Sequence, residues 1–252
     1  MKISIITVCY NSEATIEKTI QSVLEQTFNN IEYIVVDGNS KDNTLQIIKK
    51  YESNLNQWIS EPDNGLYDAM NKGIELATGD IVGILNSDDT FYNNNVLKKL
   101  ANFHKQNQID ASIGNIIQHN KNGKIVRNYS SKNWQPNKLK IGFMPPHPSI
   151  FFKRVLFKKL GNYQLDYTIG ADYELVTRFF LNNKINWKYS GITTTSMLIG
   201  GLSSSGYKSY RLISKEIMKA LIRNRIAFSP LKVRFRGFFK IMELFKKQKT
   251  IK

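Results

Sequence analysis

Two adjacent carboxylates, Asp88 and Asp89, end an apolar run in the stretch ILNSDDTFY, residues 84–92. Like charges side by side repel each other, and a chain that leaves a buried strand needs neither of them. An acidic turn would explain the pair, because Asp is common in turns. A cation held by both carboxylates is the other explanation, since Mg²⁺ and Mn²⁺ prefer oxygen ligands. The pair is therefore a candidate site for a divalent metal.

Further polar residues follow the other predicted strands. Asp37 ends the second strand, and Asp63 comes shortly after the third. Any single one of them could be a helix cap or a turn residue. Because the carboxyl ends of parallel strands meet at one edge of a sheet, we expect these side chains to converge there, where acids favour a divalent metal and ribose hydroxyls. The first and fourth strands add Thr7, Tyr10, Asn11 and Asn86.

The elements that must position these residues alternate between strand and helix. Apolar, β-branched runs predict strands over residues 3–9, 32–36, 57–60 and 80–85. Helical spacing predicts a helix after the possible cap Ser12, and further helices over 42–51 and 65–77. This alternation predicts an α/β fold with a Rossmann-like, mostly parallel central sheet flanked by helices.

The pattern changes after residue 92. The sequence predicts a helix over 94–106, an antiparallel pair over 111–119 and 124–130, helices over 153–160 and 172–183, a late strand over 185–190 and a helical segment from 207, interrupted at Pro230. We therefore expect one globular domain over 1–206, made of an α/β half (1–120) and a second half (121–206) that extends the same sheet. A basic helical tail covers 207–252.

The net charge of +16 is unevenly distributed along the 252 residues. Residues 207–252 contain 14 Lys and Arg against two acids, a net charge of +12, while the other 206 residues carry only +4. The basic residues alternate with Phe, Leu and Ile at helical spacing, which is typical of a helix that lies on an anionic membrane. A core-packing helix with a solvated basic face, and a nucleic-acid-binding surface, are the alternatives.

The remaining composition predicts an ordinary globular protein, with 41% hydrophobic and 22% charged residues. We find no apolar run of about 18 residues, so we expect no transmembrane helix. The N-terminus has no signal-peptide pattern. The single Cys9 excludes an intrachain disulfide and a Cys-based zinc site, and is expected to be a small core residue. We expect a cytoplasmic protein that binds peripherally to the inner face of the cell membrane.

Four stretches resemble the successive motifs of family 2 glycosyltransferases. They are TVCYN (7–11), VVDGNSKDNT (35–44), EPDNGLYDAMNKGI (61–74) and LNSDDTFY (85–92), and they occur in the family's order and spacing. The resemblance implies a GT-A fold, a nucleotide-sugar donor, Mg²⁺ or Mn²⁺ as cofactor, and inversion at the anomeric centre. It also implies a role in bacterial exopolysaccharide, O-antigen or capsule synthesis.

The resemblance implies that 1–206 is a catalytic domain whose first half, 1–120, binds the nucleotide sugar and whose second half, 121–206, provides the acceptor site and the base. It implies roles for several residues of the first half. Thr7, Tyr10 and Asn11 would line the base and ribose pocket, and Asp63 would lie at the nucleoside. Asp37 would accept a hydrogen bond from the base, commonly uracil, which favours a UDP-sugar. Lys72 would approach the diphosphate, or would be a solvated helix charge. Asp88 and Asp89 would bind ribose and the metal. The family often has Asp where this chain has Asn86, which leaves the metal fewer charges.

The second half resembles the family in GADYELVTRFF (170–180), whose carboxylate is a catalytic base. Asp172 would be that base, although an Asp that opens a helix is also a common cap. Glu174 is the second candidate, and Arg178 is expected to pair with a carboxylate or phosphate. His147 would contact phosphate, acceptor or metal, or be a structural histidine. The loop at Gly200 and Gly201 would bind phosphate or act as a hinge.

We therefore expect an inverting enzyme that transfers a sugar from a nucleotide-sugar donor to a saccharide acceptor, which the basic tail suggests is lipid-linked. The rival enzyme is a sugar-phosphate nucleotidyltransferase, which would need a Gly-rich, basic phosphate loop after the first strand; TVCYNSE has none. The rival without enzymatic activity is a basic nucleic-acid-binding module. That class predicts widespread positive charge, whereas residues 1–206 are nearly balanced.

Overall fold

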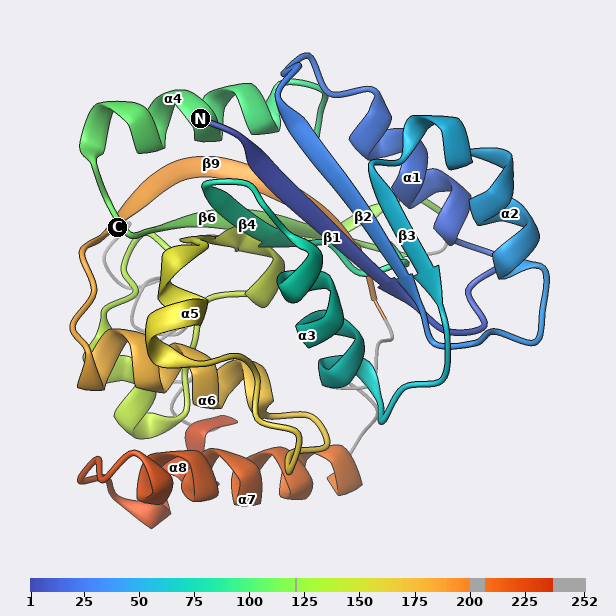
Figure 1. Cartoon of the computed structure of the whole chain (residues 1–252). Helices are drawn as coiled ribbons and strands as arrows, with labels where there is room; N and C mark the ends of the chain where they lie inside the picture. The colour runs from blue at the N-terminus through green and yellow to red at the C-terminus, as the bar shows by residue number, and fades with distance from the viewer. Residues whose placement is uncertain (121, 200–206, 238–252) are drawn as a thin grey trace. The chain divides into compact units, whose positions relative to one another are not determined.

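The computed structural model describes residues 1–120, 122–199 and 207–237 (Figure 1). The chain divides into two compact units. Unit 1 consists of Met1–Asn133, Pro145–Leu165 and Ile185–Ile199, and unit 2 of Trp134–Met144, Asp166–Lys184 and Gly200–Lys252. These units describe packing, so the functional division predicted at residue 206 stays a prediction.

Unit 1 contains a nine-stranded sheet in the order β3-β2-β1-β4-β8-β6-β9-β5, with β7 paired to β6. Four parallel strands form one side of it: β1 (Ile3–Cys9), β2 (Ile31–Asp37), β3 (Gln57–Ser60) and β4 (Ile81–Ile84). Cys9 pairs with Asp37 and Asp37 with Ser60, so three of these strands end level with one another. Polar residues at the ends of β1, β2 and β3 are therefore neighbours in space.

The second half of the chain extends the same sheet. It adds β5 (Asp89–Phe91), β6 (Ala111–His119), β7 (Ile125–Tyr129), β8 (Ile150–Lys153) and β9 (Trp187–Leu198). β8 is antiparallel to both β4 and β6, and β9 is parallel to β6. Six of the nine strands therefore run in one direction, which confirms the mostly parallel α/β sheet predicted from the sequence.

Helices cover both faces of this sheet in unit 1. They are α1 (Ile16–Leu24), α2 (Thr44–Lys50), α3 (Leu66–Leu76), α4 (Val96–Asn107) and α5 (Val155–Leu160), with short turns η1 (Glu52–Asn54) and η3 (His147–Ser149). Ile3 and Ile5 pack in one core with α1, α2 and α4. Ile6 points to the other face, because successive strand residues alternate. A Cβ on Gly73 of α3 would lie 2.3 Å from Ile6, so this glycine lets α3 pack closely against β1 (Figure 1).

Three local predictions differ from the structure in detail. Ser12 does not cap the first helix: α1 begins at Ile16 after Thr15, and the Ser12 hydroxyl is 2.8 Å from that of Ser87. The late strand is longer than predicted, because Gly191 (φ +71°) and a register shift carry it on to Leu198. The helix predicted over 172–183 is two elements, α6 (Ala171–Thr177) followed by the π-helical turn η4 (Arg178–Asn182).

Unit 2 contains the first part of the basic tail. Its elements are η2 (Pro136–Ile141), α6, η4, α7 (Tyr207–Arg223) and α8 (Pro230–Arg234). The break at Pro230 is confirmed, with Ser229 capping α8 through the Lys232 amide. Ile217, Ala220 and Leu221 on α7 are buried. The packed side of α7 is therefore a core face, and only its opposite side is available to a partner.

Candidate active site

The carboxylates of Asp88 and Asp89 lie at the carboxyl end of β4 in unit 1. Asp89 is the first residue of β5 and is only 1% exposed, while Asp88 is half-buried. The Thr19 hydroxyl on α1 donates hydrogen bonds to the carbonyls of Ser87 (2.9 Å) and Asp89 (2.8 Å). Asp88 thus lies in a turn closed by a hydrogen bond from the Asp89 amide to the Asn86 carbonyl (3.0 Å), and α1 holds this turn from behind.

The surroundings of both carboxyl groups favour their neutral forms. Burial raises the pKa of Asp88. Burial, and then the charge of Asp88, raise the pKa of Asp89 well above its usual range, although a hydrogen bond from Asn86 opposes this. Two ionised carboxylates here would repel each other in a site that water hardly reaches. The arrangement is therefore unfavourable when both groups are charged and nothing positive lies beside them.

The oxygen atoms at this site fit a divalent cation. Asp89 Oδ2 and Asn86 Oδ1 are buried and have no hydrogen-bond partner in the described part of the chain. Buried acceptors without partners are rare in folded proteins, and a metal ion would satisfy them. Oxygen ligands of this kind suit Mg²⁺ or Mn²⁺. No group of three or more His, Cys, Asp or Glu residues is placed for a metal among the described residues.

The loops after β1 and β2 are tied together by short polar side chains. The Asn11 amide donates to Ser40 Oγ, and Asn11 Oδ1 accepts from the Lys41 amide, each at 2.8 Å. The Glu13 amide donates to Asp42 (3.0 Å). Asn11 has φ +49°, a left-handed conformation that Asn tolerates better than most residues. Asn11 was predicted to line the nucleotide pocket, which stays a prediction; the structure shows that it joins the two loops.

Asp37 ends β2 and is completely buried. Ser60 Oγ donates to its Oδ2 at 2.6 Å, and Ser40 Oγ donates to its Oδ1 at 2.5 Å. The predicted hydrogen bond from Asp37 to a base stays a prediction. In this structure the carboxylate holds the ends of β2 and β3 and the loop after β2, so a ligand would reach Ser40 before it reached Asp37.

The first strand presents Tyr10 and not Thr7. Thr7 is 0% exposed, and its hydroxyl lies 3.1 Å from that of Tyr33 inside the core. Tyr10 is 60% exposed at the strand end. Thr7 and Tyr10 are three positions apart, so their side chains point to opposite sides of the extended chain. Thr7 is therefore enclosed in the core, and Tyr10 is the accessible side chain at this strand end; their predicted contacts with a nucleoside stay predictions.

Asp63 reaches back over the end of β2. A Cβ on Gly38 would lie only 2.4 Å from Asp63 Oδ2, so any other residue at position 38 would displace this carboxylate. The Gly65 amide donates to Asp63 Oδ1 at 2.8 Å. Lys72 is engaged nearby: its Nζ lies 2.7 Å from Glu61 and donates to the Pro62 carbonyl. Its predicted contact with a diphosphate would replace or share that ion pair.

His147 lies in η3 and belongs to an aromatic cluster of unit 1. Its Nε2 is 2.7 Å from the Tyr163 hydroxyl, and Tyr163 stacks on Tyr67 of α3. Asn71 exchanges two hydrogen bonds with the backbone of Tyr163. Burial lowers the pKa of His147 to about 4, so the ring is neutral at pH 7. These contacts favour the structural role among the alternatives predicted for this residue.

Unit 2 contains the predicted base. Asp172 is half-buried in the first turn of α6; the helix cap is Gly170, but Asp172 Oδ1 accepts a hydrogen bond from the Tyr173 amide (2.7 Å), so the predicted capping role is met in part. Glu174 is 1% exposed and holds Arg178 through two hydrogen bonds of 3.0 and 2.9 Å, while Asn224 donates to it as well. This buried ion pair occupies Glu174, and the choice of Asp172 as base stays a prediction. The loop at Gly200 and Gly201 lies outside the described residues.

Several residues with a clear part in the site were missed in the sequence. Ser40 and Ser60 position Asp37, and Thr19 positions the Asp88–Asp89 pair. Ser40 lies inside the VVDGNS stretch and could have been suspected from it. Thr19 sits on an amphipathic helix 70 positions before its partner, and no local pattern reveals that contact. Only the packing of α1 against β5 brings them together.

The sequence of this chain is similar to those of known proteins. The profile described as Glycosyl transferase family 2 matches residues 4–165. A relative from Mycobacterium bovis (strain BCG / Pasteur 1173P2), described as a PGL/p-HBAD biosynthesis glycosyltransferase, is 30% identical over 223 residues, which cover 86% of this chain and 83% of the relative. A glycosyltransferase from Haemophilus influenzae, described as uncharacterized, is 36% identical over 116 residues, which cover 45% of this chain and 46% of the relative.

Two solved structures share the fold. S. aureus TarS 1-349 in complex with UDP-GlcNAc has a TM-score of 0.69 at 24% identity, covering 88% of this chain and 67% of that one. The mannosyltransferase PcManGT from Pyrobaculum calidifontis in complex with GDP-Man and Mn²⁺ has a TM-score of 0.65 at 19% identity, covering 93% of this chain and 68% of that one. The strand order, the acidic end of β4 and these comparisons confirm the resemblance seen in the sequence: the chain belongs to glycosyl transferase family 2 and is a glycosyltransferase with a GT-A fold.

Proposed function

We propose that this enzyme transfers a sugar, with inversion, from a UDP-sugar to a lipid-linked saccharide in the synthesis of a bacterial surface polysaccharide such as an O-antigen or capsule. The observation that carries the proposal is the carboxylate pair at the end of β4. Asp88 and Asp89 are pressed together, with raised pKa values and a buried oxygen that has no partner in the described chain. A nucleoside diphosphate with its divalent cation is the ligand that such a site suits.

Asp88, Asp89 and Asn86 are the residues proposed to hold Mn²⁺ or Mg²⁺. Asp88 keeps part of its surface exposed, so it offers the contact nearest the ligand, while Asp89 Oδ2 lies deeper. When bound, such a cation offsets negative charge that develops on the leaving diphosphate. With two acids and an amide, we expect weak metal binding that the diphosphate strengthens. The Mn²⁺ bound in PcManGT supports this assignment.

The donor nucleoside is proposed to lie over the ends of β1 and β2. Tyr10 and Asn11 are exposed there, and Asp63 covers Gly38 beside them. Thr7 and Asp37 support these residues from inside. The UDP-GlcNAc in TarS supports a uridine donor, whereas the GDP-Man in PcManGT shows that this fold also accommodates a guanosine donor. The choice of UDP therefore rests on the predicted part of Asp37 in binding uracil.

Asp172 is proposed as the general base. The acceptor hydroxyl oxygen attacks the anomeric carbon, its proton passes to the Asp172 carboxylate, and the bond from that carbon to the diphosphate oxygen breaks. Attack from the side opposite the leaving group inverts the centre. A positioned carboxylate contributes typically 10²–10⁴-fold to such a step. Asp172 is partly exposed, as this task requires. Glu174 does not meet this requirement, because it is fully buried with Arg178.

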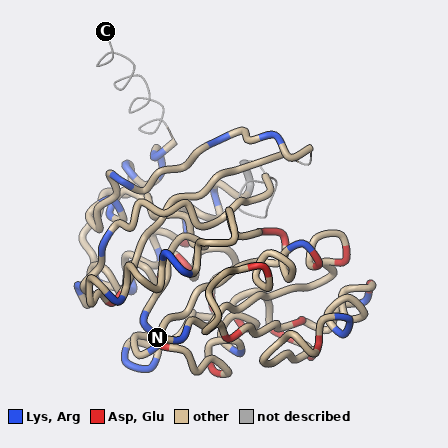
Figure 2. Tube along the Cα trace, turned by 90° about the horizontal axis from the view of Figure 1, so that it is seen from above, with Lys and Arg blue, Asp and Glu red and all other residues tan. Residues whose placement is uncertain are grey.

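The outer side of α7 and α8 is proposed to bind an anionic membrane. Ile222, Leu231 and Phe235 are 67%, 68% and 55% exposed, which is unusual for side chains of this size. Basic residues surround them in the sequence, and Figure 2 shows Lys and Arg, in blue, along the trace that leads to the last described residue. No helix among the described residues is long and apolar enough to span a bilayer. Peripheral binding would bring the enzyme to a lipid-linked acceptor.

A panel of nucleotide sugars tests the donor and the metal together. We expect UDP-sugars with Mn²⁺ to raise the melting temperature most, because a ligand at 100 times its Kd adds about 2.7 kcal/mol to the free energy of unfolding. Asp88→Asn should lose the Mn²⁺-dependent part of the shift and nearly all transfer activity. Stabilisation and turnover that are unaffected by a chelator would refute the metal assignment.

Asp89→Asn tests the cost of the buried charge. The unfolded carboxyl ionises near pH 4, whereas burial keeps Asp89 protonated in the folded state to a higher pH. As the pH rises through this interval, the unfolded state loses its proton first and wild-type stability falls. Without metal, the variant should therefore be more stable than wild type at neutral pH, with the difference vanishing near pH 4. Urea unfolding at several pH values measures this, and parallel curves would contradict it.

Asp172→Asn tests the base. We expect kcat to fall by roughly 10²–10⁴-fold, with the Kd of the donor unchanged, because the amide cannot take the proton. Asp80→Asn is the matched control, since its carboxylate is 65% exposed and precedes β4 at the amino end of the sheet. Wild-type turnover in Asp172→Asn would move the base elsewhere.

The triple substitution Ile222→Ser, Leu231→Ser and Phe235→Ser tests the proposed membrane-binding surface. We expect binding to vesicles of phosphatidylglycerol to weaken at least about tenfold, because each buried apolar side chain contributes about 1.5–3 kcal/mol. Removal of the whole tail would be a poorer test, since α7 is part of the core of unit 2. Serine at Ile125 and Val126, 51% and 50% exposed on β7, is the control. Equal sedimentation of both variants with vesicles would refute the assignment.

A further inference from the structure

The segment before Asp172 is held by a carboxylate from the basic tail. Glu216 lies on α7 and is only 8% exposed. Its Oε1 accepts a hydrogen bond from the Thr168 amide at 2.7 Å, and its Oε2 accepts from the amides of Ile169 (2.9 Å) and Gly170 (2.7 Å). Three consecutive backbone N–H groups therefore converge on one side chain that lies 46 to 48 positions away in the sequence.

This contact supplies hydrogen-bond acceptors that the side chain of Gly170 cannot provide. Gly170 is the cap residue of α6 and has no side chain to accept hydrogen bonds, and the start of a helix leaves N–H groups without partners. Hydrogen bonds from N–H groups to a carboxylate are about twice as strong as those between neutral groups. Glu216 thus fixes the backbone two residues before Asp172.

The space around Glu216 is fitted to it. A Cβ on Gly170 would lie 3.0 Å from Glu216 Cβ and 3.1 Å from Oε2, closer than most side chains approach. The glycine therefore allows the carboxylate to lie directly against the backbone. A larger residue at position 170 would push α7 or the segment away.

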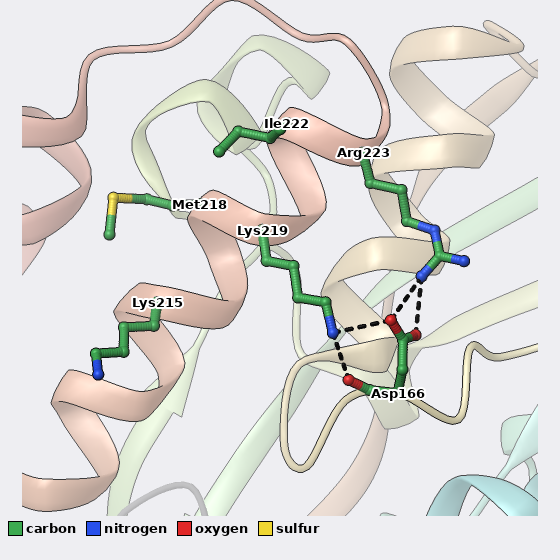
Figure 3. Close-up of a pocket in the computed structure, with 6 residues that line it drawn as sticks. All are labelled: Asp166, Lys215, Met218, Lys219, Ile222 and Arg223. Carbon is green, nitrogen blue, oxygen red and sulfur yellow. Dashed lines mark hydrogen bonds and ion pairs between the residues drawn. The ribbon is translucent and has the colours of Figure 1, made fainter.

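A second contact joins the same two elements at the surface. Asp166 lies 2.8 Å from both Lys219 Nζ and Arg223 Nη1, at the side of an open cavity on α7 (Figure 3). All three side chains are between 43% and 52% exposed. Ion pairs this open to water contribute little. The buried contact of Glu216 is therefore the one that determines where the segment lies.

We propose that Glu216 is a positioning residue for the transfer reaction: by fixing residues 168–170 it holds the Asp172 carboxylate where it can take the acceptor proton. This rests on the proposed role of Asp172 as base. The helix α7, which composition predicts to bind a membrane, thereby also positions the proposed base. Small displacements of a catalytic group are costly, since a shift of about 1 Å can lower the rate roughly 10²-fold.

Glu216→Ala in the full-length protein tests the proposal with three measurements. Amide hydrogen exchange of residues 168–170 should become faster, because the three N–H groups lose their acceptor. The kcat for transfer should fall roughly 10- to 100-fold. The Kd and stoichiometry of donor binding should stay at their wild-type values, which separates misplacement of the base from a loss of folded enzyme. Glu216→Gln keeps one acceptor oxygen and should lie between wild type and the Ala variant.

Asp166→Asn is the matched control, because it loosens the exposed contact between the same elements; its kcat should stay within about twofold of wild type. If Glu216→Ala does not fold, Gly170→Ala displaces the carboxylate without removing it and should show the same pattern more weakly. Faster exchange with unchanged kcat would overturn the positioning role and leave Asp172 as the base. Wild-type turnover in Asp172→Asn would instead remove the base on which the proposal rests.

Discussion

The repulsion between Asp88 and Asp89 is the interaction on which the rest of the site depends. Both side chains could relieve it by turning into water, but Asp89 begins β5, which pairs with β9, and Thr19 holds its carbonyl from behind. The fold therefore keeps the two carboxyl groups together at the end of β4. Burial raises the pKa of both, and the charge of Asp88 raises that of Asp89 further. Protein sites commonly give up stability in this way where function requires it.

The ends of the other parallel strands are joined to one another by short polar side chains. β1, β2 and β3 end level, so Asp37 can hold Ser40 and Ser60 at the same edge. Several residues that resemblance assigned to the ligand turn out to have partners within the protein already. They form a hydrogen-bonded base beneath the groups that remain exposed, Tyr10 and Asn11, and the partly buried Asp63. A preorganised surface of this kind loses little entropy when a nucleotide binds.

The tail shows how one helix can have two faces with different tasks. The buried residues of α7 belong to the core of unit 2, and Glu216 among them reaches the segment before Asp172. The opposite side carries basic residues together with Ile222. Composition suggested a membrane-binding helix or a core helix as alternatives. The burial of α7 shows that its inward face is part of the core, and the membrane proposal now concerns only its outer face.

The sequence alone determined the order of strands and helices, the acidic strand ends and the family, because buried runs and turn residues are local patterns that packing preserves. It also predicted roles for Asp88, Asp89 and Asp172, the last from the family resemblance, and these roles stay predictions. It could not place Thr7 in the core, show that Asn11 joins two loops, or pair Glu174 with Arg178 as a buried unit. It also could not reveal Thr19 or Glu216, whose partners lie about 70 and 46 positions away. Such contacts depend on which faces of distant elements meet, and only the tertiary structure decides that.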